Sequence, residues 1–156
     1  MVFWPWRRFE CAITLNKKSL IDSSFRKVLS TGPHSQLIVM SLQPGEDLGS
    51  SAHFADQLFL IEQGTGELTI EGMFSPLVAG DLVHVPGGAH HNISANSDEA
   101  LRLVVVCSPP HYMRRCEHET KADAIEAESE EESLAYREAH REYAKTRSRF
   151  FASERE

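Results

Sequence analysis

Short runs of apolar and β-branched residues, broken at close intervals by glycine, proline, asparagine, aspartate or serine, fill the chain from Phe25 to Cys107. Strand-length runs separated by turn residues are typical of antiparallel sheets that pack into a sandwich or a barrel. The expected strands are 25–29, 36–42, 57–62, 67–71, 81–85, 91–95 and 101–107. The pattern therefore predicts an all-β domain.

The pattern changes after Ser108-Pro109-Pro110. Residues 120–151 contain no proline or glycine and are rich in Ala, Glu and Arg, which predicts a C-terminal helix. In this helix Tyr136, Tyr143 and Phe150 recur every seven residues and form a narrow stripe that docks on the barrel or on a second subunit. The alternative is a solvated helix or a partly disordered acidic segment. We divide the chain into an N-terminal arm (1–23), a barrel (24–112) and a connection with a charged helix (113–156).

Charge and composition exclude several classes of function. The 156 residues carry a net charge of −7, which opposes binding to nucleic acid or to an anionic membrane. No apolar run approaches the roughly 18 residues of a membrane span. The three cysteines contain no C-x-x-C pair and predict reduced thiols, not a disulfide framework. We expect a cytoplasmic protein without a membrane or nucleic-acid partner.

Side chains able to bind a metal recur on strand faces that point inward. By alternation, Gln57, Phe59 and Ile61 share one strand face, and His53 lies across a bend from them. His91 follows the turn Pro86-Gly87-Gly88 at the start of another strand, where a barrel rim delivers a side chain into the lumen. Two imidazoles and one amide oxygen form an incomplete coordination shell with open positions for water or ligand.

The spacing of these residues resembles the two motifs of the cupin family. The first motif, Gly-x5-His-x-His-x3/4-Glu-x6-Gly, aligns with Gly45, Ser51, His53, Gln57 and Gly64 with every interval kept. The second motif, Gly-x5-Pro-x-Gly-x2-His-x3-Asn, aligns in order with Gly80, Pro86, Gly88 and His91, and its last position slips by one to Asn96. The chain is similar to small cupins described as mannose-6-phosphate-isomerase-like, over about Ser24 to Ala124.

This resemblance implies a double-stranded β-helix, or jelly-roll barrel, with a metal site in its lumen. The implied ligands are His53, Gln57 and His91, and the implied cofactor is a divalent transition metal such as Zn, Mn, Fe, Ni or Cu. The chain departs from the family pattern at Ser51 and Gln57, where most metal cupins have His and Glu. The loss of a carboxylate weakens the attraction for a cation and removes a general base.

Other residues are predicted to line the pocket or to pack around it. Asp56 is expected to orient a ligand or a bound water, and Ser51, Phe59, Gln36 and Met40 are expected to face the ligand. For Phe59, Gln36 and Met40 core packing is the default. We interpret His111, after the Pro-Pro bend, as an exposed loop histidine; the alternative is that it caps the mouth of the pocket.

The sequence is compatible with three functions. The first is a metal-dependent enzyme acting on a small polar metabolite by isomerase, epimerase or dioxygenase chemistry. The second is a non-catalytic barrel that holds a small ligand, with or without a metal, while its acidic-to-basic C-terminal helix binds a partner protein. The degenerate metal site at Ser51 and Gln57 favours this function. The third, a purely structural barrel, is opposed by the inward polar residues. The resemblance to cupins implies a homodimer, and the aromatic residues of the N-terminal arm also predict one, because they could pack across an interface.

Overall fold

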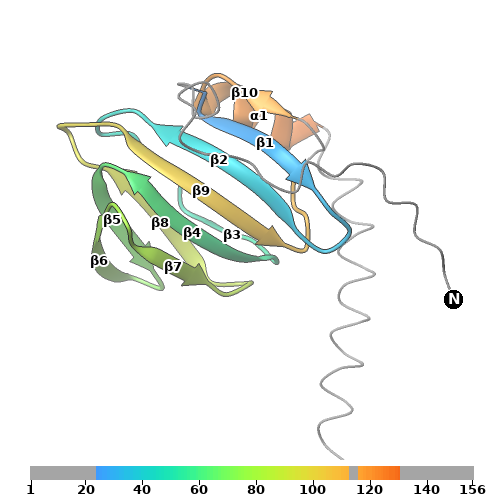
Figure 1. Cartoon of the computed structure of the whole chain (residues 1–156), viewed down its shortest axis with the longest axis horizontal. Coiled ribbons are helices and arrows are strands. Elements are labelled where there is room, and N and C mark those ends of the chain that lie inside the picture. The colour runs from blue at the N-terminus through green and yellow to red at the C-terminus, as the bar shows by residue number, and fades with distance from the viewer. Residues whose placement is uncertain (1–23, 113–115, 131–156) are drawn as a thin grey trace, which may run out of the picture.

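A computed structural model of the chain describes residues 24–112 and 116–130, which form two antiparallel sheets and one helix (Figure 1). The six-stranded sheet has the order β10-β1-β2-β9-β4-β7, and the four-stranded sheet has the order β3-β8-β5-β6. The elements are β1 (Arg26–Thr31), β2 (Gln36–Leu42), β3 (Ser51–Ala52), β4 (Asp56–Gln63), β5 (Thr65–Ile70), β6 (Met73–Val78), β7 (Leu82–Val85), β8 (His90–Ala95), β9 (Leu101–Ser108), β10 (Glu117–His118) and α1 (Lys121–Glu130). The predicted all-β architecture with a helix after it is confirmed.

Alternation along the central strands builds the core between the sheets. In β4 the side chains of Gln57, Phe59 and Ile61 are buried, and the residues between them are exposed or partly exposed. β4 pairs with β9, whose Leu103 also belongs to the core, and Ile93 of β8 contributes from the other sheet. Burial of such side chains is the main favourable term in folding, and it fixes which face of each strand looks inward.

The strand β6 was not expected from the sequence. It contains Pro76, and its large apolar residues come in adjacent pairs instead of alternating with polar ones, so hydrophobic alternation does not identify it. It lies at the edge of the four-stranded sheet, where it pairs only with β5. Proline is tolerated there because an edge strand has one side that makes no ladder hydrogen bonds.

The helix α1 begins where the sequence predicts a helix. A reciprocal cap fixes this start: the Thr120 backbone N–H donates to Asp123 Oδ2 (3.0 Å), and the Asp123 N–H donates to Thr120 Oγ1 (3.2 Å). Ala124 packs into the core, and α1 lies beside β10, which extends the six-stranded sheet beyond residue 112 by pairing with β1 (Figure 1). Within the described residues, no helix is both long and apolar enough to cross a membrane.

Two sequence predictions lie outside the described residues. They are the aromatic arm at residues 1–23 and the stripe of Tyr136, Tyr143 and Phe150.

Close packing of β5 against β8 makes Gly66 a sensitive position. A Cβ atom at Gly66 would lie 2.2 Å from the carbonyl oxygen of Ser94, whereas a Cβ at Gly32 would meet nothing closer than 3.5 Å. We predict that Gly66→Ala lowers the free energy of unfolding by roughly 1–3 kcal/mol, as overpacking does, and that Gly32→Ala changes it little. Urea unfolding measures both, and equal midpoints for the two variants would show that the close approach is not a constraint.

Candidate functional site

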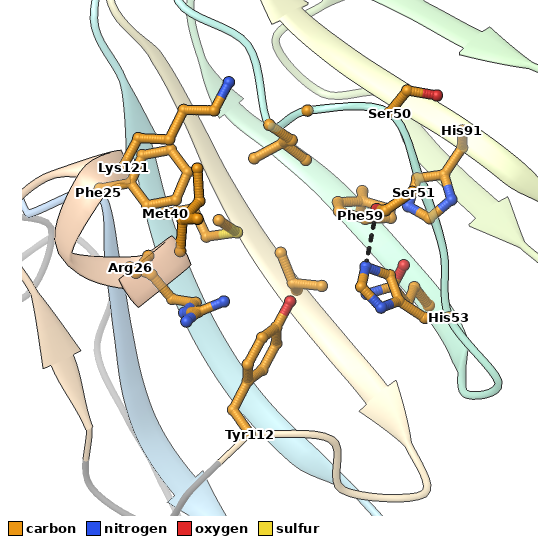
Figure 2. Close-up of a pocket in the computed structure, with 16 residues that line it drawn as sticks. Phe25, Arg26, Met40, Ser50, Ser51, His53, Phe59, His91, Tyr112 and Lys121 are labelled. Atoms are coloured by element: carbon orange, nitrogen blue, oxygen red, sulfur yellow. Dashed lines mark hydrogen bonds between the residues drawn. The ribbon is translucent and has the colours of Figure 1, made fainter. Parts of the chain in front are cut away.

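One cavity of about 240 Å³ opens between the sheets and α1 (Figure 2). Its lining comes from β1, β2, β4, β8, β9 and α1, from β3 with the loops on either side of it, and from the segment after β9. The lining residues are Phe25, Arg26, Met40, Leu48, Gly49, Ser50, Ser51, His53, Gln57, Phe59, His91, Val105, Tyr112, Lys121, Ala124 and Ile125. Of the sequence-predicted site residues, Ser51, His53, Gln57, Phe59, His91 and Met40 therefore share this space.

Strand pairing brings the two motif segments together. The short strand β3 pairs with β8 so that Ser51 lies directly opposite His91. His53 follows two residues after Ser51, and the Ser51 hydroxyl forms a 3.0 Å hydrogen bond with His53 Nε2 (Figure 2). The ring centroids of His53 and His91 are 5.7 Å apart.

The turn before His91 is bonded to the segment that carries His53. The Gly88 N–H donates to the His53 carbonyl oxygen (2.7 Å), and the Gly87 N–H donates to Asp56 Oδ1 (2.7 Å). A Cβ at Gly87 would lie 2.2 Å from the Phe54 carbonyl oxygen, so only glycine allows this approach. The two histidine segments are therefore held as one unit, although nearly forty residues separate the imidazoles.

The hydrogen bond of His91 determines which ring nitrogen faces a ligand. His91 Nδ1 lies 3.1 Å from the Ala89 carbonyl oxygen, which can only accept, so Nδ1 carries the proton. The lone pair of the neutral ring is then on Nε2. Burial lowers the pKa of His91 and outweighs the Ala89 hydrogen bond, which raises it. A buried, neutral imidazole with a free lone pair is the form that binds metal ions.

Gln57 presents an unsatisfied oxygen in the same cavity. Its Nε2 donates to Cys107 Sγ at 3.6 Å, and its buried Oε1 has no hydrogen-bond partner. Burial raises the pKa of the Cys107 thiol to about 11, so the thiol stays protonated at neutral pH and is not a reactive thiolate. A buried carbonyl oxygen without a partner costs free energy unless a ligand, ion or water binds it.

The two imidazoles and the Gln57 oxygen are suitable ligands for a transition metal that has few protein ligands. A metal–nitrogen bond of about 2.0–2.1 Å allows two imidazoles on one ion to have centroids up to about 6 Å apart, and 5.7 Å lies within that limit. Gln57 Oε1 adds a neutral oxygen donor. Across the described residues, however, no group of three or more His, Cys, Asp or Glu side chains converges as a metal cage. Any ion bound here would depend on two histidines, Gln57 and exogenous ligands.

Sequence reasoning missed the other side of the cavity. Arg26 of β1 is 2% exposed, and its guanidinium carbon lies 4.0 Å from the ring centroid of Tyr112. Lys121, the first residue of α1, forms an ion pair with Asp47 that lowers the pKa of that carboxyl group. Arg26 shares its strand face with buried Val28, and this alternation was the available signal. Tyr112 and Lys121 lie outside the regular strands and gave none.

Two predicted pocket residues do not line the cavity. Gln36 is buried, but its amide bonds Thr31 Oγ1 and the backbone of His111 and Tyr112, so it holds the segment after β9 in place. Asp56 is exposed and accepts from the Gly87 N–H, so it supports the turn before His91 from outside the cavity lining.

The interpretation of His111 as an exposed loop residue is wrong. His111 is buried, and its ring centroid lies 4.5 Å from that of His53. The Gln36 side chain accepts from the His111 backbone N–H at 3.2 Å and so draws the loop inward. A loop anchored by a distant buried amide cannot be recognised from local sequence, because the two residues are 75 positions apart.

Comparisons with known proteins agree with this architecture. The family model described as "Cupin domain" matches residues 38–107. The Bacillus subtilis protein YrkC, described as uncharacterized, is 36% identical over 123 residues, which cover 74% of this chain and 66% of YrkC. The mimivirus protein L612, also described as uncharacterized, is 34% identical over 107 residues, covering 64% of this chain and 66% of L612. The chain thus spans slightly less than two thirds of these relatives.

One solved structure matches a larger part of this chain than the family model and the two relatives do. The crystal structure of BH2720 from Bacillus halodurans superimposes with a TM-score of 0.72 at 28% sequence identity, covering 79% of this chain and 97% of that protein. Its coverage extends the similarity beyond the segment that the family model matches.

Burial of His91 predicts a pH-dependent stability of the metal-free protein. Its folded pKa lies below the ordinary value of 6.5, so the unfolded chain binds more protons as the pH falls below 6.5. The contribution of His91 is therefore fully present above pH 6.5 and declines from there toward the folded pKa. Urea midpoints measured from pH 8 to pH 5 should fall less steeply for His91→Gln than for the wild type, because glutamine does not titrate. His90→Gln, at the exposed neighbouring position, should retain the wild-type profile, and an unchanged profile in His91→Gln would contradict the assignment.

Proposed function

Because this chain belongs to the cupin superfamily, we propose that its barrel binds one divalent transition-metal ion between His53 and His91 and holds a small polar metabolite beside it. The observation that carries this proposal is the buried Gln57 Oε1, which lacks a hydrogen-bond partner and lines the same cavity as both imidazoles. A third donor without a partner in a cavity that two histidines also line favours a shared guest over simple core packing.

The donor types narrow the metal and the chemistry. Two imidazoles and a neutral amide oxygen suit Zn, Mn, Fe, Ni or Cu better than Mg or Ca, which prefer several oxygen ligands. When bound, such an ion would polarise a carbonyl group or activate water or oxygen. Isomerase, epimerase and dioxygenase reactions are the classes that we propose for it.

The protein's own residues would bind and orient the guest. His91 would present Nε2 because its Nδ1–H is held by the Ala89 carbonyl oxygen. Phe59 and Met40, both buried in the lining, would exclude water from the site. The described lining contains no Asp or Glu side chain, so the general base would be an imidazole or hydroxide formed from water on the ion.

A second candidate is a barrel that binds its ligand without a metal. The Ser51–His53 hydrogen bond favours it, because it engages His53 Nε2, a nitrogen that would otherwise be available to an ion. The neutral Gln57 also lacks the charge that offsets a divalent cation. In this case the polar lining would bind the ligand directly by hydrogen bonds.

Metal analysis of the purified chain tests the first candidate. We expect close to one transition-metal ion per chain after loading and dialysis, and at least a tenfold lower affinity in His53→Ala and in His91→Ala, because each removes one of only two imidazole ligands. His90→Ala removes an exposed imidazole from the adjacent position and should leave the metal content unchanged.

The results distinguish the two candidates. A chain that stays metal-free at saturating metal but still binds small molecules would support the second candidate. Full metal occupancy in either His53→Ala or His91→Ala would refute the ligand assignment.

We also propose that the chain forms a homodimer. Leu58, Leu60 and Leu82 on the outer face of the six-stranded sheet are 40%, 36% and 68% exposed, and Leu60 pairs directly with Leu82. Neighbouring exposed leucines on a sheet face often mark an interface. This face, together with the aromatic residues of the N-terminal arm, is the surface that we propose to be shared between two copies.

Light scattering during gel filtration tests the dimer. We expect the wild type to be a dimer. The double variant Leu58→Ser/Leu82→Ser, and the protein without residues 1–9, should dissociate at protein concentrations at which the wild type is still dimeric, because both changes remove apolar contact area. Met73→Ser/Phe74→Ser removes exposed apolar side chains from the other sheet and should leave the mass unchanged. A monomeric wild type at all concentrations would disprove the proposal.

A further inference from the structure

The cavity has one end that accepts hydrogen bonds, formed by the neutral side chains of Gln57 and His91. Gln57 Oε1 is buried and finds no hydrogen-bond partner among the described residues. The Nδ1–H of His91 donates to the Ala89 carbonyl oxygen, so Nε2 of the neutral ring is also an acceptor. Both side chains line the cavity. Two neutral acceptors are best satisfied by a guest group that donates hydrogen bonds.

The opposite side of the cavity is largely apolar. Phe25 and Met40 lie across the cavity from Ser51 and His91 (Figure 2). Water in contact with apolar side chains is released when the hydrocarbon part of a guest takes its place, which favours binding. We call the apolar side chains of the lining, other than Phe59, the apolar wall; they are Phe25, Met40, Leu48, Val105, Ala124 and Ile125.

Ile125 of α1 is the part of the apolar wall that core packing does not explain. It lines the cavity but is 56% exposed, whereas its neighbour Ala124 is 2% exposed and belongs to the hydrophobic core. Other large hydrophobic residues that the described chain exposes, such as Val78, do not line the cavity. An exposed isoleucine at the cavity gains contacts when an apolar guest packs against it.

Two cations also line the cavity, and both contact other groups of the protein. Lys121 pairs with Asp47, and the guanidinium carbon of Arg26 lies 4.0 Å from the ring centroid of Tyr112. The carbon stems of such long side chains add apolar surface even where their charged ends bind elsewhere. Arg26 and Lys121 therefore do not require a charged guest.

From these two sides we infer that the guest is a small amphipathic alcohol. Its hydroxyl end donates to Gln57 Oε1, with His91 Nε2 as a second acceptor, and its hydrocarbon end packs against the apolar wall at Ile125. The inference rests on the proposed function in that it takes the same cavity as the ligand site, and it names the class of metabolite.

Charge and size narrow this class. An ammonium group also donates hydrogen bonds, but two neutral acceptors do not replace the hydration that its charge would lose on burial. The hydroxyl is therefore the donor that fits. The cavity volume of about 240 Å³ is below the roughly 300–1,000 Å³ of sites for drug-sized ligands, so the guest is of small-metabolite size.

A chain-length series tests the apolar end on the metal-free, full-length wild-type protein. The probes are ethanol, n-butanol and n-hexanol, and the readout is an NMR titration that follows the backbone amides. We expect the dissociation constant to fall by roughly two- to fourfold for each added CH₂ group, because each one removes apolar surface from water. An affinity that does not rise from ethanol to n-hexanol would overturn the inference.

Isomeric ethers test the hydroxyl end on the same protein. Methyl propyl ether and methyl pentyl ether contain the same atoms as n-butanol and n-hexanol but cannot donate a hydrogen bond. We expect each alcohol to bind about fivefold or more tightly than its isomer, because only the alcohol satisfies a buried acceptor. Equal binding of alcohol and ether, or tighter binding of n-hexylammonium than of n-hexanol, would overturn the inference.

Variants at the two ends locate the binding. Ile125→Ser should weaken the binding of n-hexanol by about threefold or more and leave that of ethanol nearly unchanged. Val78→Ser is the matched control, because Val78 is 51% exposed and lies outside the cavity. Gln57→Met keeps the length of the side chain but removes the acceptor, so it should reduce the preference for n-hexanol over methyl pentyl ether. Gln57→Glu keeps an acceptor and should retain this preference. Circular dichroism checks that each variant folds.

The results separate this inference from the metal proposal. Equal losses of n-hexanol affinity in Ile125→Ser and Val78→Ser, or an unchanged preference for the alcohol in Gln57→Met, would overturn the inference. Alcohol binding by a protein that stays metal-free at saturating metal would leave the inference standing and refute the metal proposal. Metal binding by a protein that binds none of the alcohols would refute the inference alone.

Discussion

The site depends on one set of backbone hydrogen bonds, those that join the turn before β8 to the segment between β3 and β4. Pairing of Ser51 with His91 fixes the register, and the Gly88 N–H bond to the His53 carbonyl oxygen fixes the turn. Because a one-residue slip in a strand reverses every side chain, this register decides that His91 faces the lumen and His90 faces solvent. Gly87 is needed for the close approach of the two backbones, and Gly88 adopts a positive φ of 93° that favours glycine.

The same cavity combines two chemical environments that come from different parts of the fold. The four-stranded sheet supplies His91, and the neighbouring segment supplies His53, whereas β1, α1 and the segment after β9 supply Arg26, Lys121 and Tyr112. Gln36 stabilises the second group from a distance by bonding the backbone at Tyr112.

The strands with strong alternation and the two histidine segments were predictable, since hydrophobic period and turn residues are local properties. Gln57, Phe59 and Ile61 face inward as parity predicts. The rest depends on tertiary contacts. β6 is an edge strand that contains Pro76 and exposes most of its side chains, and the backbone of His111 is held by the Gln36 side chain, 75 positions away. Arg26 was overlooked because a cation is an uncommon occupant of an inward strand position.

Anomalous diffraction from crystals of the cobalt-loaded protein tests the central claim most directly, because it locates the ion independently of any activity. The account predicts a single strong peak inside the barrel, at about 2.0–2.2 Å from one ring nitrogen of His53 and one of His91. A peak at a surface histidine such as His84 or His90, or no peak in the barrel at saturating cobalt, would contradict it.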